Sequence, residues 1–471
     1  MNKKILGAAL LTALPMGAAS AATGYLQYGG GNATSLTTRA AGLSAVTGNP
    51  AAGHNLLREG QNFRTGIFSI PQFGAELGPV DNFTDDVDEF QDRFEQLEED
   101  FDNAQTQQEL DQARADGAQL FADFRPVLTE ISDAAFLNLD FQQQIPLTPA
   151  VFRALGGVFT VNLSADVKMK LRTVGADIFF VDDQKNRVAD DSDQADDIST
   201  DLAAFVKAGA FGELAVGYSR ELPLAGLLPL PEGLRLSAGG RLKVVQGVLS
   251  KAVARVQDDE DDNGNEEDDT AMDRALDNFD DRKQTTTSFG VDVGVMGEWK
   301  GFYGGLTVFN LIAPEFDYPE LGGDCDAIYL DKNSGAYKDC EAENSFGDQV
   351  GLTETYSDDT RLHAELGYRI LESNWVIGGA LDLNKVESVV GDEFQWASLT
   401  AGYESQNWWL PGFTLGLRQN LAGSELSFAT ASVGLLRVMR INLSYGLEQA
   451  EHEDESVPRG LAVGIGFEMP I

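Results

Sequence analysis

Apolar and polar residues alternate along most of the chain from Phe63 to the C-terminus. In the stretch RLHAELGYRI at 361–370, every second residue from Leu362 to Ile370 is apolar or aromatic, and the positions between them hold charged residues, a histidine and a glycine. This period of two is typical of a strand with one apolar and one polar face. Fourteen segments show the pattern: 63–77, 156–171, 174–182, 203–219, 234–249, 286–299, 302–312, 359–370, 374–385, 394–404, 411–421, 425–437, 439–448 and 458–469.

The connections between these segments also alternate in length. Those after even-numbered segments are mostly short, and those after odd-numbered segments include the long stretches 78–155, 183–202, 250–285 and 313–358. Outer-membrane barrels have short periplasmic turns and long external loops, whereas a soluble β-sandwich is not expected to sort its loops in this way. We therefore predict an all-β fold, a transmembrane outer-membrane β-barrel of about 14 antiparallel strands.

Tryptophans support the same prediction. Four of the five lie at the short-turn end of the predicted strands, where an aromatic girdle would meet the membrane interface: Trp299, Trp375, Trp408 and Trp409. The apolar faces would then contact outer-membrane lipid and lipopolysaccharide, and the polar faces would line the lumen.

The N-terminus has the features of a secretory signal peptide. Lys3 and Lys4 precede an apolar run, and Ala19-Ser20-Ala21 forms a small-residue cleavage site. We expect residues 1–21 to be removed and the mature protein to reach the outer membrane of a Gram-negative bacterium. No later stretch approaches the ~18 consecutive apolar residues of a transmembrane helix.

The strongly negative net charge limits which partners the protein can bind. It is −41, and loss of Lys3 and Lys4 with the signal peptide takes it to −43. Phosphate binding needs a basic surface, so we expect no direct contact with nucleic acid. An acidic surface suits solubility in salt or the binding of divalent cations.

The long loops carry further signals. Within 81–131, phenylalanine, leucine and valine recur at spacings of four and three from Phe83 to Phe101, and a weaker stripe follows that is interrupted at Gly117. This pattern predicts a helical hairpin insertion. Two interpretations remain open: a loop that packs on itself, or a docking surface outside the barrel.

Two other loops contain candidate bonds or ligands. Cys325 and Cys340, in the loop 313–358, are an even pair in an exported chain, so we predict a disulfide. The acidic loop 250–285 contains DDEDDNGNEEDD, in which Asp259, Asp261 and Asn263 fit the first positions of a calcium loop. Thr270 stands where that loop needs a bidentate glutamate, so a solvated acidic loop, like 183–202, is the alternative to a calcium site. No other cofactor is expected.

Charged residues on the inward faces could build a site in the lumen. Strand parity predicts that these residues point inward: Lys168, Lys170, Arg235, Arg241, Lys243, Asp292, Arg361, Glu365 and Arg369. They form either a structural network that holds a plug or a path for an anionic ligand. The sequence has no catalytic motif and its three histidines are far apart, so we expect a protein that is not an enzyme.

A plug is suggested by the segment RAAGLSAVTGNPAA. Its turn at Gly48, Asn49, Pro50 and Ala51 cannot lie inside a strand ladder, because proline lacks a backbone donor. This segment, followed by an alternating barrel, resembles the FadL-type outer-membrane channels for long-chain fatty acids. The resemblance implies a plug or hatch in residues 22–60 and a barrel with large external loops in 61–471.

A second resemblance covers most of the mature chain. The stretches LRLSAGGRLKVVQ (234–246), SFGVDVGVMGEW (288–299), LHAELGYRI (362–370) and LGLRQNLAGSE (415–425) are similar to the TraF-like family of conjugal-transfer outer-membrane proteins. This resemblance implies an envelope-associated barrel, either a gated channel or a docking component that contacts conjugation or envelope proteins. The alternatives are FadL-type transport of hydrophobic small molecules and a structural or adhesive barrel with a sealed lumen.

Overall fold

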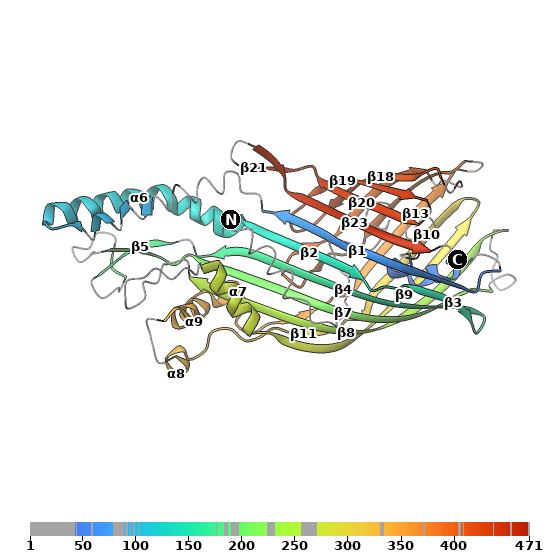
Figure 1. Cartoon of the computed structure of the whole chain (residues 1–471), viewed down its shortest axis with the longest axis horizontal. Coiled ribbons are helices and arrows are strands. Elements are labelled where there is room, and N and C mark those ends of the chain that lie inside the picture. The colour runs from blue at the N-terminus through green and yellow to red at the C-terminus, as the bar shows by residue number, and fades with distance from the viewer. Residues whose placement is uncertain are drawn as a thin grey trace.

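The computed structural model of the chain shows a long, closed β-barrel with helices and small sheets at one end (Figure 1). The signal peptide, residues 22–42 and the calcium candidates Asp259, Asp261 and Asn263 lie outside the described residues. The structure describes residues 43, 45–57, 60–78, 89, 93, 94, 96, 97, 99–101, 103–175, 177–182, 187–189, 197–223, 231–255, 271–329, 334–370, 373–403, 407, 409–436, 438–452 and 455–469.

The barrel has fourteen strand positions, all antiparallel to their neighbours, which confirms the predicted fold. One position holds two short strands, β2 and β3, which both pair with β1 on one side and β4 on the other, and so close the ring. Around the ring the strands are β1 (Phe63–Leu77), β2 (Phe136–Gln144) with β3 (Ala150–Ala154), β4 (Gly157–Val174), β7 (Ala203–Glu221), β8 (Arg235–Arg255), β9 (Gln284–Trp299), β10 (Phe302–Ile312), β13 (Arg361–Arg369), β14 (Trp375–Asp382), β17 (Trp396–Tyr403), β18 (Gly412–Asn420), β19 (Ser427–Leu435), β20 (Met439–Gly446) and β23 (Gly460–Met469).

The count of fourteen was right through two errors that offset each other. The predicted strand 174–182 is not part of the wall: Ile178–Val181 (β5) instead pairs with Asp197–Thr200 (β6) in a separate two-stranded sheet. The true second position, β2 with β3, lies inside the stretch that we predicted to be a long loop. Two prolines, Pro146 and Pro149, fall in the break between β2 and β3 and interrupt the alternation there.

An arm extends from the long-loop end of the barrel. It consists of α6 (Gln107–Ala134) and the β5–β6 sheet (Figure 1). The apolar stripe of the insertion packs on this sheet: Leu120, Phe121 and Phe124 lie in one buried cluster with Ile178 and Phe180. The described part of the arm therefore packs on itself, and these apolar side chains are buried.

The long strands β4, β7 and β8 extend beyond the rest of the ring and are covered on both faces. Helix α7 (Ala271–Asp281) packs on one face through Ala275, against Ala204 and Val206. A second group of elements, all from the loop 313–358, contributes Phe346 and Ala342 to the other face. These elements are β11 (Glu315–Asp317), α8 (Cys325–Ile328), α9 (Gly335–Ser345), α10 (Gly347–Val350) and β12 (Thr355–Ser357).

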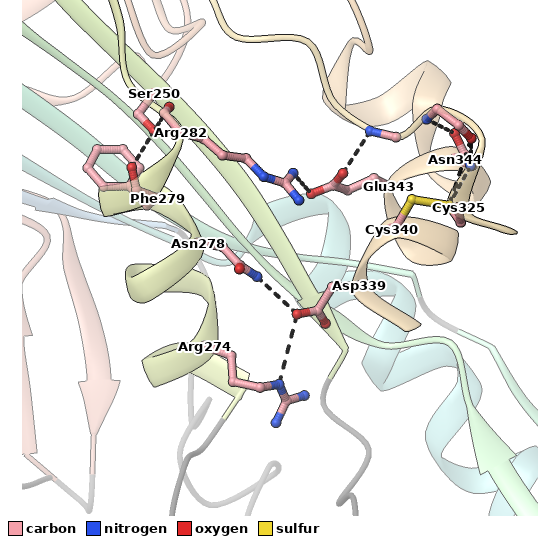
Figure 2. A network of polar contacts seen from close by, with 12 residues as sticks. Ser250, Arg274, Asn278, Phe279, Arg282, Cys325, Asp339, Cys340, Glu343 and Asn344 are labelled. Atoms are coloured by element: carbon pink, nitrogen blue, oxygen red, sulfur yellow. Dashed lines mark hydrogen bonds and ion pairs between the residues drawn. A yellow bond between two sulfur atoms is a disulfide. The ribbon is translucent and has the colours of Figure 1, made fainter. Parts of the chain in front are cut away.

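Polar contacts join the two coverings, as Figure 2 shows. Asn278 of α7 donates a hydrogen bond of 3.0 Å to Asp339 of α9, and Arg282 pairs with the buried Glu343. Cys325 and Cys340 form a disulfide that links α8 to α9. The loop 313–358 is thus a folded cap on the long-loop end.

The outer surface of the ring is apolar. Outward-facing leucines on successive strands are well exposed, among them Leu306, Leu366 and Leu399. Aromatic rings gather at the short-turn end, where Phe302 lies 4.6 Å from Tyr368 and Trp375 lies 5.7 Å from Phe413, measured between ring centroids. An apolar outer surface with an aromatic girdle at one end suits contact with lipid hydrocarbon. The barrel is therefore of the outer-membrane type.

Among the described residues, no helix is long and apolar enough to cross a membrane.

Substitution of a lipid-facing leucine by arginine tests the membrane assignment. Leu399 lies in the middle of β17 with 70% of its surface exposed, so Leu399→Arg should lower the free energy of unfolding in lipid vesicles by about 2–4 kcal/mol. Leu155, 84% exposed in the β3–β4 turn, is the matched control, and Leu155→Arg should cost less than about 1 kcal/mol. Equal costs at the two sites would contradict a lipid-facing Leu399.

Candidate functional site

The N-terminal segment 43–57 packs inside the short-turn half of the barrel, and we call it the plug. It contains three short helical turns: α3 (Ala45–Gly48), η1 (Pro50–Ala52) and α4 (Gly53–Leu56). The predicted turn Gly48, Asn49, Pro50 and Ala51 lies at its centre and is buried. Asn49 begins η1, because its Oδ1 accepts the Ala51 N–H at 2.9 Å, and its Nδ2 donates to the Val295 carbonyl of the wall at 3.3 Å.

Glycines on neighbouring strands make room for this turn. A Cβ atom added at Gly294 would lie 2.1 Å from Asn49 Oδ1, and one at Gly239 would lie 2.5 Å from the Pro50 carbonyl oxygen. Gly239 of β8 and Gly294 of β9 are directly paired across the sheet. The wall therefore lacks side chains where the plug approaches it most closely.

A buried ion cluster holds the plug from the β8–β10 side. Arg241 Nη1 donates to the carbonyls of Val46 and Thr47 at 2.9 and 3.0 Å, and its Nε donates to Asp292 at 2.7 Å. Lys243 Nζ lies 3.0 Å from the other oxygen of Asp292. Because all three charges are buried, removing one partner would leave an uncompensated charge, which costs about 3–5 kcal/mol.

A bulge in β10 completes this cluster. The register of β9 and β10 shifts between Val308 and Ile312, and Asn310 there has a left-handed backbone with φ of 50°. Its N–H donates to Asp292 at 2.8 Å, and its Oδ1 accepts from Lys243. The irregular backbone thus supplies a donor that an unbroken ladder would have used within the sheet.

A loop crosses the lumen near its other end. The connection 383–395 between β14 and β17 contains the short strands β15 (Val386–Glu387) and β16 (Glu393–Phe394). We call residues 383–395 the luminal loop. Its Asp392 pairs with Lys170 of β4 and accepts a hydrogen bond of 2.8 Å from Asn138 of β2. Those strands lie on the opposite side of the ring, so the loop spans the barrel.

The cap reaches into the lumen beside this loop. Tyr318 donates its hydroxyl hydrogen to the Val389 carbonyl, and Glu354 pairs with Lys207 of β7 and lies 3.3 Å from Lys251 of β8. A buried apolar cluster lies where the cap, the luminal loop and the wall meet: Phe211, Val245, Leu249, Phe316, Tyr318, Tyr356, Val389 and Val390. The cap and the luminal loop thus both occupy the long-loop end of the lumen.

The other predicted luminal charges lie elsewhere along the lumen. Lys168 pairs with Asp140 at 3.0 Å, and Arg361 lies 3.6 Å from Asp382. Glu365 is buried, Arg369 is half-buried, and Arg235 is mostly exposed at the short-turn rim, where it pairs with Glu298. The structure thus pairs Lys168, Lys170, Arg241, Lys243 and Arg361 with carboxylates, which favours a network that holds the plug and loops.

Several residues of the site were missed by the sequence analysis. Asp140 lies on the unpredicted strand β2, so parity was never applied to it. Asp392 and Glu354 lie in long connections that show no periodicity. One signal was available: Gly239 and Gly294 fall at inward positions of predicted strands, where glycine often marks the close approach of another backbone.

One closed antiparallel ring with an apolar belt, and with segments of the chain packed inside it, defines an outer-membrane β-barrel. A family model described as "F plasmid transfer operon, TraF, protein" matches residues 46–382. That range is well over half of the chain, and the protein belongs to this family. A search of curated proteins found no match.

Several solved structures follow a similar course of the chain. A mutant of the monoaromatic hydrocarbon channel TodX has a TM-score of 0.44 and 9% identity, covering 91% of this chain and 95% of that one. The Ralstonia pickettii toluene transporter TbuX has a TM-score of 0.38 and 8% identity, covering 94% and 96%. A Pseudomonas aeruginosa FadL homologue has a TM-score of 0.39 and 9% identity, covering 96% and 98%.

A methyl group at Gly294 tests how the plug is seated. In Gly294→Ala the new Cβ would displace the Asn49 side chain, so amide hydrogens of residues 45–52 should exchange with solvent at least ~10-fold faster. Gly466 of β23 is the matched control, because a Cβ there meets no atom within 4 Å. If exchange of the plug is the same in Gly294→Ala and Gly466→Ala, the plug is not seated against β9.

Proposed function

We propose that the protein is a gated passage for small, partly hydrophobic molecules across the outer membrane. The observation that carries this proposal is that the plug and the luminal loop both lie inside the lumen. Neither segment belongs to the barrel wall, and each is attached to it by polar contacts and by a buried apolar cluster. A wall that is stable without them leaves both segments able to move.

The contacts that hold the closures are of a kind that can be exchanged. Arg241 binds two backbone carbonyls of the plug, and Asp392 binds Lys170 and Asn138. A polar contact of this kind can be replaced by one to water or to a ligand at a modest net free-energy change. The luminal loop is also packed through Val389 and Val390, which are buried in an apolar cluster with residues of the wall and the cap.

Deleting the closures one at a time tests the gating. In planar bilayers the native protein should show brief openings, and replacement of either residues 43–57 or residues 386–394 by a short glycine–serine linker should lengthen them. The variant with both replacements should conduct steadily, because two barriers in series are then both removed. If the native protein and both single variants stay silent and only the double variant conducts, the lumen is sealed and the barrel has a structural or adhesive role.

The arm favours a second role, contact with a partner in conjugal transfer or elsewhere in the envelope. It extends beyond the barrel at the long-loop end (Figure 1), and residues 81–134 include 17 acidic and 3 basic residues, a net charge of −14. The apolar side chains of α6 that pack on β5 and β6 are buried within the arm. Such a contact would therefore be polar and weakened by salt.

Removal of the arm tests this second role. A variant that lacks residues 83–130 should lower plasmid transfer and partner binding, and the loss of binding should be copied in the intact protein by raising the salt concentration. The double variant Asp116→Asn and Asp123→Asn, on the exposed face of α6, should weaken binding without removing the arm. Unchanged transfer and binding in the deletion variant would exclude the arm as a docking element.

A further inference from the structure

We infer that a chamber beside the luminal loop binds a small amphipathic amine, with the protonated nitrogen at Glu76 and the apolar part against the loop. This inference rests on the proposed passage and names the class of molecule that it admits. The chamber has a volume of about 460 Å³, within the range of pockets that enclose small organic molecules. Its polar lining includes Glu76, Asn138, Asp140 and Asp392.

The chamber lies at the outer end of the lumen. It is lined by Glu76 near the end of β1, Phe136 at the start of β2, Trp396 at the start of β17 and Asn420 at the end of β18. The ends of β1 and β2 adjoin the arm, the start of β17 follows the luminal loop, and the end of β18 leads into the connection 421–426. A ligand would therefore enter from outside the cell, before it reaches the plug.

Hydrogen-bond acceptors in the lining lack donors. Asp140 is 6% exposed and its Oδ1 has no hydrogen-bond partner among the described residues, and the same holds for Asn138 Oδ1. Glu76 is 7% exposed and has no ion pair within 4 Å among the described residues. Its carboxyl group has a hydrogen bond with the Ser424 side chain. The two oxygens without partners call for a ligand that brings hydrogen-bond donors, and Glu76 calls for one that brings a positive charge.

The cations of the chamber are already engaged. Lys168 Nζ lies 3.0 Å from Asp140 Oδ2, and the Arg459 Nε–H donates to the Leu77 carbonyl at 3.1 Å. Lys170 lies beside the chamber and pairs with Asp392, and its Nζ lies 4.6 Å from the centre of the Phe136 ring. An anionic head group would have to compete with these contacts, whereas an ammonium group would add contacts that the chamber lacks.

The remaining walls suit an apolar body. Val390 and Phe394 of the luminal loop line the chamber with Phe136 of β2 and Trp396 of β17. Phe394 and Trp396 are buried in one apolar cluster with Phe428. Because Val390 and Asp392 lie two residues apart on the loop, a bound molecule would touch the segment that closes the lumen.

A series of ligands with one chain length tests the inference. Octylamine, octanol and octanoate would be titrated calorimetrically into the full-length barrel in lipid nanodiscs, with empty nanodiscs subtracted. Octylamine should bind at least ~10-fold more tightly than the other two. Glu76→Gln should remove this preference, while Glu298→Gln, at the opposite rim and outside the chamber, should keep it.

A second variant covers a failure of Glu76→Gln to assemble. Ser424→Leu, in the β18–β19 connection, places bulk in the chamber and should abolish octylamine binding. Tighter binding of octanoate, equal binding of all three ligands, or unchanged amine binding in both variants would overturn the inference. Amine binding without any channel opening would support the amine site and contradict the proposed passage. Channel opening without amine binding would support the passage and contradict the amine site.

Discussion

A ring of fourteen strands encloses more space than its own inward side chains can fill, and this constraint shapes the rest of the molecule. Closure of the ring satisfies the backbone in lipid, and the excess space must then hold water or other parts of the chain. Here the chain supplies the filling from two directions: the N-terminal segment at the short-turn end, and the luminal loop and the cap at the other. Buried charges follow from this arrangement, because inward faces that are polar must be paired once segments pack against them.

The ring could be predicted from the sequence because lipid on one face and a polar lumen on the other impose strict alternation. Parity placed Arg241, Lys243 and Asp292 on the inward face, and the structure brings all three together. Strand parity failed in two segments where other features of the chain decide the structure. The segment around Phe180 has the β-branched and aromatic residues of a strand, but it forms a small sheet under α6. The second wall position escaped detection because prolines interrupt it and a helix precedes it directly.

The contacts made by loops could not be predicted in the same way. Asp392 and Glu354 occur in stretches without periodicity, and their partners Lys170 and Lys207 are remote in sequence. Spatial proximity across the lumen is a property of the closed ring, so no local pattern encodes it. Gly117 shows the same limit: within the sequence it is an unfavourable residue in a helix, yet a Cβ there would lie 2.7 Å from the Phe180 ring. Gly117 lowers the stability of the helix, but its lack of a side chain allows α6 to pack closely on Phe180.

The bridge from Asp392 to Lys170 and Asn138 has a mechanical consequence. A thin-walled tube flattens easily when it is squeezed from the side, and an internal strut across its diameter resists that ovalisation. Asp392 comes from the loop between β14 and β17, and its partners belong to β4 and β2 on the opposite side of the ring, so the bridge limits how far these two sides can separate.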